Sequence, residues 1–233
     1  MDLTAIAASG MQQDLLRMDS ISQNIANALT PGYKRQTVTG IGFAQQVTAG
    51  LAAESVAVTS INPQPGTLRP TANPLDLAID GAAYFEVATE QGSAYTRQGA
   101  FHTDVRGRLV TASGAAVMGS GGEILLNGAF AVDANGDVRQ GDQVVARLKL
   151  VNFSNPEALQ PIGGGVYVQG GARVAEEPLT SSVRSSFLEN SNVNTAQEMV
   201  QLTATVRHFE AMQKILQGYD DSLEKTIRKL GEF

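Results

Sequence analysis

A run of apolar residues near the C-terminus sets the strictest limit on how this chain can fold. Its members recur three or four positions apart, and they are Met199, Leu202, Val206, Phe209, Met212, Leu216, Tyr219, Leu223, Ile227 and Leu230. Because an α-helix completes a turn about every 3.6 residues, these side chains share one face of a helix of roughly 30 residues. A helix with a single apolar face is marginal in water by itself. The pattern therefore predicts a long C-terminal helix that packs against a partner, with Thr195 and Glu198 as a capping box at its start.

The N-terminal segment has a shorter helical pattern. Its stripe recurs at the same spacing, at Met11, Leu15, Met18, Ile21 or Ser22, and Ile25. Pro31 cannot continue a helix, and Gly32 can adopt the positive φ angle of a turn. The sequence therefore predicts a helix that ends before a turn at residues 30–33. Asn24 and Asn27 lie on one face of this helix, where their amide groups either set the register of a helix pair or are simply solvated.

The middle of the chain changes to the period of two that is typical of β-strands. The predicted strands are residues 75–79, 83–89, 108–111, 123–126 and 144–153. Turn-forming pairs such as Asp80-Gly81 and Asn135-Gly136 separate them, and the second pair suits a type I′ turn. A proline-rich stretch at residues 62–74 predicts an extended connector into this region.

Together these patterns predict an α+β protein, with a mainly-β central domain flanked by N- and C-terminal α-helices. The expected division is residues 1–36 for the N-terminal helix and its turn, 37–74 for the connector, 75–180 for the β-rich domain and 181–233 for the C-terminal helix. The two helices can pack on the sheet, as in an ordinary α+β domain. They can also pair with each other and with other copies as a coiled-coil layer. The length of the C-terminal pattern, which exceeds that of a typical globular helix, favours the coiled-coil layer.

The composition argues against most kinds of chemistry. The 233 residues include no cysteine and two histidines, His102 and His208, which removes thiol nucleophiles and leaves few ligands for a metal. A net charge of −6 without a dense basic run disfavours nucleic-acid binding, and no apolar run is long enough for membrane insertion. Residues 133–137 are similar to the start of a calcium loop, but Val138 and Val144 stand where that loop requires Gly and Glu. We therefore expect no enzyme, no catalytic residues, no cofactor and no metal site.

Several short segments carry more specific patterns than periodicity. Residues 23–34 read QNIANALTPGYK, and residues 191–200 read SNVNTAQEMV, followed by Arg-His-Phe-Glu at residues 207–210. These segments resemble the bacterial flagellar rod and hook axial proteins, which have Asn-Asn-Leu-Ala-Asn and Thr-x-Gly-Phe/Tyr-Lys near the N-terminus and Val-Asn, Glu-Met-Val and Arg-x-Phe/Tyr-Glu near the C-terminus. The internal segments that look like this family's β-domain are residues 73–81, 95–101 and 107–110. The resemblance covers essentially the whole chain.

The resemblance implies a structural subunit of the flagellar basal-body rod, which transmits torque to the hook. Its implied partners are other copies of itself, other flagellar rod proteins and the flagellar type III export apparatus. Its implied location is the periplasm, reached without a cleaved signal peptide; Asp2, where a secretory signal carries Lys or Arg, agrees with this. The assembly-interface residues expected from the helical patterns and from these motifs are Met11, Leu15, Met18, Asn24, Ile25, Asn27, Pro31, Gly32, Tyr33, Val193, Asn194, Met199, Leu202, Val206, Phe209, Met212, Leu216 and Leu223.

Within the family, the chain is most similar to the proximal-rod branch. The features that favour this branch are residues 147–151, residues 207–210 and the short connector between Gln36 and Asn62. Residues 155–159 and 163–168 look like the distal-rod branch, so a distal-rod or hook-type axial subunit stays the alternative. Outside this family, the competing interpretation is a secreted β-domain adhesin that is trimerised by its helices.

Overall fold

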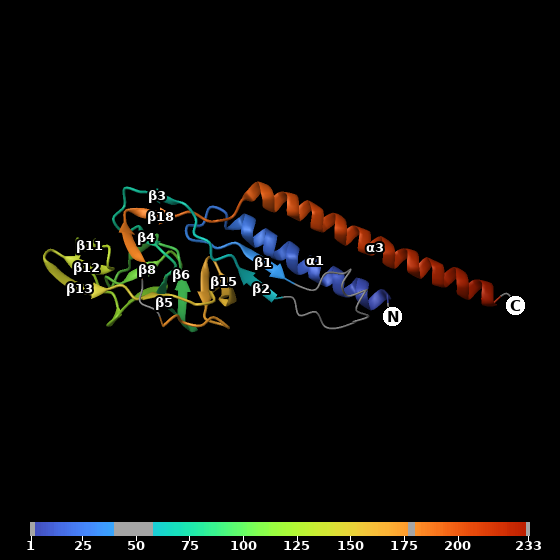
Figure 1. Ribbon diagram of the computed structural model, residues 1–233, viewed down its shortest axis with the longest axis horizontal. Helices are drawn as coiled ribbons and strands as arrows, with labels where there is room; N and C mark the ends of the chain where they lie inside the picture. Colours follow the sequence, from blue (N-terminus) through green and yellow to red (C-terminus); the bar gives the residue numbers. More distant parts are fainter. Residues whose placement is uncertain (1–2, 40–57, 177–179, 232–233) are drawn as a thin grey trace. The chain divides into compact units, whose positions relative to one another are not determined.

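The computed structural model describes residues 3–39, 58–176 and 180–231 of the chain (Figure 1). The chain divides into two compact units, which we describe separately. The helical unit comprises Met1–Ile25, Gln36–Thr59 and Asn194–Phe233, and the β unit comprises Ala26–Arg35 and Ser60–Val193.

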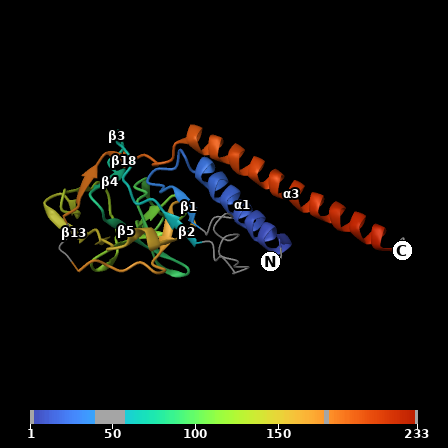
Figure 2. The ribbon, with the colours of Figure 1, turned by 45° about the vertical axis from the view of Figure 1, so that its right-hand side comes forward.

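The helical unit is built on two long helices. Helix α1 spans Leu3–Ala26 and helix α3 spans Thr195–Gly231. The two helices run side by side in opposite directions in both views (Figures 1 and 2). Strand β1, Gln36–Thr39, pairs with β2, Val58–Ile61, as a two-stranded sheet.

The β unit is organised around an antiparallel sheet of nine strands. Its main path runs in the order β15, β16, β6, β5, β9, β8, β7, with β10 paired to β9 and β14 paired to β5. The bounds along that path are Gln160–Gly163, Val166–Val168, Gly92–Thr96, Tyr84–Thr89, Ala116–Gly119, Leu109–Thr111 and Phe101–Thr103, with β10 at Gly122–Glu123 and β14 at Leu150–Val151.

Three smaller sheets complete the described part of the β unit. Strands β11 (Ala131–Val132), β12 (Asp137–Gln140) and β13 (Gln143–Arg147) form the first. Strand β17 (Ser182–Ser185) pairs with β4 (Leu77–Asp80), and β18 (Phe187–Glu189) pairs with β3 (Leu68–Pro70). A 3-10 helix, η1, spans Pro156–Ala158.

Strand β5 separates two apolar clusters because successive side chains of a strand point to opposite faces. Phe85 is fully buried in a large aliphatic cluster with Leu109 and Val117. Tyr84 faces a smaller aromatic cluster, where its ring meets Phe153 edge-on at a centroid distance of 5.8 Å and Tyr167 at 6.3 Å. Burying a side chain of this size stabilises the fold by about 1.5–3 kcal/mol. Strand β5 therefore contributes one such side chain to each cluster.

The structure confirms the α+β class, with an N-terminal helix, a mostly-β centre and a C-terminal helix. The single strand predicted at residues 144–153 is wrong, because β13 and β14 belong to different sheets. Between them Leu148 N donates to Gly136 O at 2.8 Å and Lys149 N donates to Met118 O at 2.9 Å, so the chain changes its hydrogen-bonding partners there.

Two local predictions also need correction. The Asn135-Gly136 turn is not type I′, since Gly136 has a positive φ angle of 82° and Asn135 does not; Gly136 N instead donates to Asp133 O at 2.9 Å. At the start of α3 the capping oxygen is Asn194 Oδ1, which accepts from Gln197 N at 3.3 Å, so Asn194 takes the role predicted for Thr195.

Candidate assembly surface and its buried polar supports

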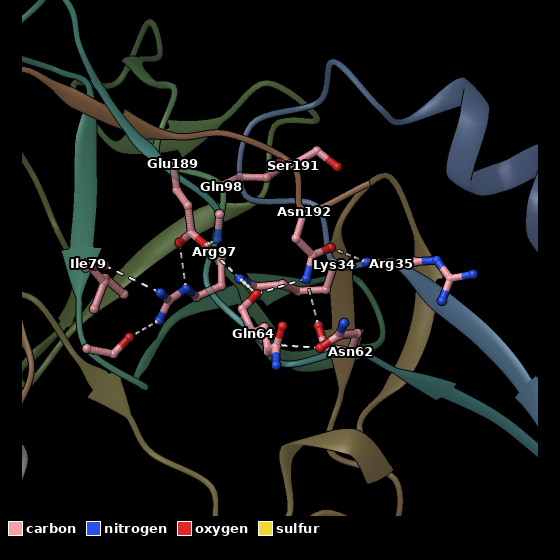
Figure 3. A network of polar contacts seen from close by, with 12 residues as sticks. Lys34, Arg35, Asn62, Gln64, Ile79, Arg97, Gln98, Glu189, Ser191 and Asn192 are labelled. Carbon is pink, nitrogen blue, oxygen red and sulfur yellow. Dashed lines mark hydrogen bonds and ion pairs between the residues drawn. The ribbon is translucent and has the colours of Figure 1, made fainter. Parts of the chain in front are cut away.

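Three charged side chains from distant parts of the β unit meet almost without exposure to solvent (Figure 3). Lys34 follows the turn after α1, Arg97 follows β6, and Glu189 ends β18. Their side chains are 1%, 3% and 1% exposed, respectively. Glu189 Oε1 accepts from Lys34 Nζ at 2.6 Å, and Glu189 Oε2 accepts from Arg97 Nε at 2.8 Å. We call these three residues the ionic junction.

Backbone groups satisfy the rest of the ionic junction. Lys34 Nζ donates to Gln64 O at 2.8 Å, Gly66 N donates to Glu189 Oε1 at 2.8 Å, and Arg97 Nη1 donates to Gly81 O at 2.8 Å. Burial lowers the pKa of Lys34, while the carboxylate of Glu189 raises it and so opposes that effect. Two cations therefore share one carboxylate, and backbone carbonyl oxygens accept further hydrogen bonds from both cations. Removing the carboxylate would leave uncompensated buried charge, which is costly.

The turn that delivers Lys34 is fixed by close contacts within the β unit. Gly32 has a φ angle of 69°, and its N–H donates to Glu189 O at 2.8 Å. A Cβ atom at Gly32 would lie 2.2 Å from Arg97 O, so no side chain fits without moving the backbone. Tyr33 is buried, and Lys34 N donates to the Tyr167 hydroxyl at 2.9 Å. The predicted residues Gly32 and Tyr33 thus lie inside the β unit, and Pro31 is half-buried beside them.

Asn192 continues this network on the C-terminal side of β18. Its Oδ1 accepts from Arg35 N at 2.7 Å, and its Nδ2 donates to Asn62 O at 3.0 Å and to Gln64 O at 2.8 Å (Figure 3). The segment that leaves the N-terminal turn and the segment that approaches α3 are therefore held to the same connector residues.

In the helical unit, Asn24 is fully buried and bonded in three directions. Its Oδ1 accepts from Gln36 N at 2.8 Å, and its Nδ2 donates to Gln36 O at 2.8 Å and to Glu198 Oε2 at 3.1 Å. Asn24 thus joins α1 to β1 and to α3. At Asn27, its predicted companion, Oδ1 accepts from Thr30 Oγ1 at 3.2 Å just after the end of α1.

A second polar contact joins the two helices. His208 Nδ1 and Asp14 Oδ2 are 2.6 Å apart; Asp14 is buried and His208 is exposed. Along the chain, Asp14 is separated from Asn24 by the same number of residues as Glu198 is from His208. Because the spacing of the two contacts is the same on both helices, both contacts fit a single register of an antiparallel helix pair. The two contacts therefore define that register.

The apolar stripe of each helix is covered only in part. On α1 the side chain of Ile21 is buried and those of Met11, Met18 and Ile25 are half-buried, but Leu15 is 54% exposed. On α3 Met212 is buried, and Leu202, Phe209 and Leu216 are half-buried; the side chain of Leu223 lies outside the described set. Val193, which precedes α3 in the β unit, is half-buried.

Apolar side chains remain exposed on both helices. They are Leu15 and Leu16 on α1, and Met199, Val200, Val206, Ile215, Tyr219 and Ile227 on α3. We call them the exposed apolar set. Met199 and Val206 belong to the predicted stripe, whereas Val200 and Ile215 lie outside it. These side chains point in several directions around the helix pair, so they are available to contact more than one neighbouring protein.

Sequence reasoning missed the polar supports. Lys34 and Arg97 occur inside the motifs at residues 23–34 and 95–101, but nothing in their local patterns indicated burial. Glu189 and Asp14 carried no signal at all, because their partners lie 155 and 194 positions away in the chain.

In the described part of the chain, no three His, Asp or Glu side chains gather as a metal site. His102 lies in β7 opposite Val110. Among the helices that the structure describes, none has the length and apolar character to cross a membrane.

Three family models match the chain. "Flagella basal body rod protein" matches residues 5–34, "Flagellar hook protein FlgE/F/G D1 domain" matches residues 78–126, and "Flagellar basal body rod FlgEFG protein C-terminal" matches residues 184–229. These ranges contain most of α1 and its turn, the centre of the nine-stranded sheet, and most of α3.

Relatives align with nearly the whole chain. "Flagellar basal-body rod protein FlgF" of Mesorhizobium japonicum is 32% identical over 243 residues, covering 99% of this chain and 98% of its own length. "Flagellar basal-body rod protein FlgG" of Bacillus subtilis is 32% identical over 260 residues, covering 94% of this chain and 95% of its own length. FlgF of Rhizobium meliloti is 34% identical over 228 residues, covering 92% of each. The chain therefore belongs to the flagellar basal-body rod protein family, and it is a structural protein, not an enzyme.

Proposed function

We propose that this chain is a proximal-rod subunit of the flagellar basal body, similar to FlgF, that self-assembles through its terminal helices into the shaft transmitting torque to the hook. The observation that carries the proposal is the exposed apolar set on a helix pair whose register is held by buried polar contacts. Because the inner faces of α1 and α3 already contact each other, the exposed apolar set is available to neighbouring subunits. In the assembly the helices then form a coiled-coil layer.

The assignment to the proximal rod is supported by how the relatives align. The alignment with FlgF spans 243 positions and covers 99% of this chain. The alignment with FlgG is longer, at 260 positions, but covers only 94% of this chain. The FlgG relative therefore carries more residues that this chain lacks, in keeping with the short connector between Gln36 and Asn62. A distal-rod or hook-type subunit is the second candidate, because FlgG relatives also align from end to end.

The remaining parts of the proposal concern partners, location and domain division. We propose that the neighbours are other copies and other rod proteins, that the subunit reaches the periplasm through the flagellar type III export apparatus, and that residues 1–36, 37–74, 75–180 and 181–233 act as its functional segments. The relatives cited above are named as rod proteins, so they do not support the secreted adhesin.

The test is a cryo-EM map of basal bodies purified from the source bacterium, with this chain traced by its side chains. The expected result is density for the chain in the rod between the export apparatus and the distal rod, with α1 and α3 contacting neighbouring subunits. Density for the chain in the distal rod would select the second candidate. Its absence from the basal bodies of a motile strain would contradict both.

A further inference from the structure

The turn between β7 and β8 presents an apolar side chain with nothing around it. Val105 is 104% exposed, the highest value among the large apolar side chains of the described residues. The next residue, Arg106, is also exposed, and in the described part of the chain its guanidinium makes no ion pair. We call Val105 and Arg106 the peg.

The backbone under the peg is tightly held. Asp104 Oδ1 accepts from Arg106 N at 2.8 Å and from Arg108 N at 2.9 Å, and Asp104 Oδ2 pairs with Arg108 Nε at 2.8 Å. Gly107 N donates to Asp104 O at 2.9 Å. These bonds, first of all the one from the Arg108 backbone, lower the pKa of the Asp104 carboxyl. Because the backbone of this turn is already held, it loses little further entropy when the turn docks.

A surface hollow of about 370 Å³ lies at the β5–β6 and β8–β9 turns of the same unit. Its lining includes Ala88, Glu90, Gln91, Ala115 and Ile162. Ile162 is exposed, and the exposed Glu90 carboxylate makes no ion pair among the described residues. The hollow therefore offers apolar side chains beside an anion, which complements the apolar and cationic side chains of the peg.

The peg and the hollow lie at opposite ends of β8. The peg is in the turn that enters β8 from β7, and the hollow includes Ser113 and Gly114 of the turn that leaves β8 for β9. Because both neighbouring strands are antiparallel to β8, these two turns point in opposite directions along it. A subunit cannot fill its own hollow, but a second copy stacked in the same orientation can.

We propose that the β units of adjacent copies interlock head to tail, with Val105 of one copy seated against Ala88, Ala115 and Ile162 of the next and Arg106 paired with Glu90. The contact uses two different surfaces, so it does not close into a dimer and continues from copy to copy, as a rod requires. This inference rests on the proposed rod function and adds a second contact to the helical one.

Cross-linking tests the contact directly, since the chain has no cysteine of its own. Val105→Cys with Gln91→Cys in one chain, oxidised in purified basal bodies, is expected to give a ladder of dimers, trimers and larger products. Each single variant is expected to give none, and so is the control pair Val105→Cys with Val174→Cys, which places the second thiol at another exposed valine. Dimers from Val105→Cys alone would indicate a symmetric contact and overturn the inference.

The outcomes separate this inference from the proposed function. If the double variant is present in the basal bodies but gives no ladder, the head-to-tail contact is wrong and the rod assignment stands. If the chain is absent from the basal bodies of a motile strain, the rod assignment itself fails, and the inference fails with it.

A charge exchange gives an independent measurement. Arg106→Glu places like charges opposite each other and is expected to lower the amount of subunit in basal bodies about tenfold. Adding Glu90→Arg to that variant restores the attraction and should recover most of the loss. Equal loss in the single and the double variant would overturn the pairing of Arg106 with Glu90.

Discussion

Glu189 receives contacts from three separate segments of the β unit, so it shows what single residues contribute. Its carboxylate accepts from the side chains of Lys34 and Arg97 and from Gly66 N, and its backbone carbonyl accepts from Gly32 N. A buried carboxylate between two cations is stable only while all its partners are present. The residue therefore couples the N-terminal turn to the C-terminal strand.

Glu189→Gln should lower the free energy of unfolding by about 3–5 kcal/mol, because it leaves two buried cations without a carboxylate. Lys34→Met is the informative comparison. It removes the second cation and leaves Arg97 and Glu189 as a neutral pair, so its cost should be clearly smaller. Urea unfolding of both variants measures the difference, and a larger loss for Lys34→Met would contradict the assignment.

Gly32→Ala should destabilise the chain more than Gly114→Ala does. Both glycines have positive φ angles, 69° and 85°, so both variants carry a backbone cost of about 1 kcal/mol or more. Only at Gly32 would the new Cβ atom also clash, 2.2 Å from Arg97 O, whereas nothing lies within 4 Å of it at Gly114. Thermal unfolding of the two variants tests this, and equal losses would show that the close approach is unimportant.

Alkaline pH should weaken the fold through Tyr84. Burial raises the pKa of Tyr84 to about 12, while an unfolded tyrosine has a pKa near 10. Between these values the folded state keeps a proton that the unfolded state loses, so this contribution to stability is full below about pH 10 and disappears toward about pH 12. Urea titrations across this range should show a shallower decline for Tyr84→Phe, and an unchanged slope would contradict the prediction.

At the scale of elements, the predictable features were those set by local chemistry. The turn after α1 followed from Pro31 and Gly32, although the helix itself already ends at Ala26. The places of β5 and β8 followed from the turn-forming pairs on either side of them. The split between β13 and β14 was unpredictable, because residues 144–153 contain no Gly or Pro to mark a break, and only tertiary hydrogen bonds from Leu148 and Lys149 divide them.

The register of the helix pair also escaped prediction, since it depends on contacts between residues far apart in the chain. Asn24 was singled out as a register residue, but its partners Gln36 and Glu198 were not. The covered face of α3 likewise includes the polar residues Glu198 and Thr205, which interrupt an apolar stripe. A stripe read from sequence cannot show which of its residues a partner covers.

Asn24→Ala should weaken the helical unit, because it leaves Gln36 N, Gln36 O and Glu198 without the bonds they make to the Asn24 side chain. Leaving a buried polar group without a hydrogen bond lowers the free energy of unfolding by about 1–3 kcal/mol for each group. The neighbouring Gln23→Ala is the control, since the hydrogen bond from Gln23 Nε2 to Asp19 Oδ2 is an exposed contact within one helix, worth about 0.5 kcal/mol or less. Far-ultraviolet circular dichroism during heating should show earlier loss of helix for Asn24→Ala alone.

For the molecule as a whole, we propose that neighbouring subunits cover the exposed apolar set in the rod. Family membership was predictable from the terminal motifs, because they are short, ordered and local. The exposed apolar set was not, since Val200 and Ile215 lie outside the predicted stripe and Leu202 within it is half-covered.

The most direct test is the incorporation of Met199→Asp/Ile215→Asp into basal bodies, compared with Gln197→Asp/Gln213→Asp. All four positions are exposed in the single chain, so both variants should fold and be produced like the wild type. A carboxylate buried in an interface without a partner costs several kcal/mol, and each copy in the rod repeats that cost. We predict that Met199→Asp/Ile215→Asp is absent from purified basal bodies and abolishes swimming, whereas the control variant is incorporated and its cells swim. Normal incorporation of Met199→Asp/Ile215→Asp would contradict it.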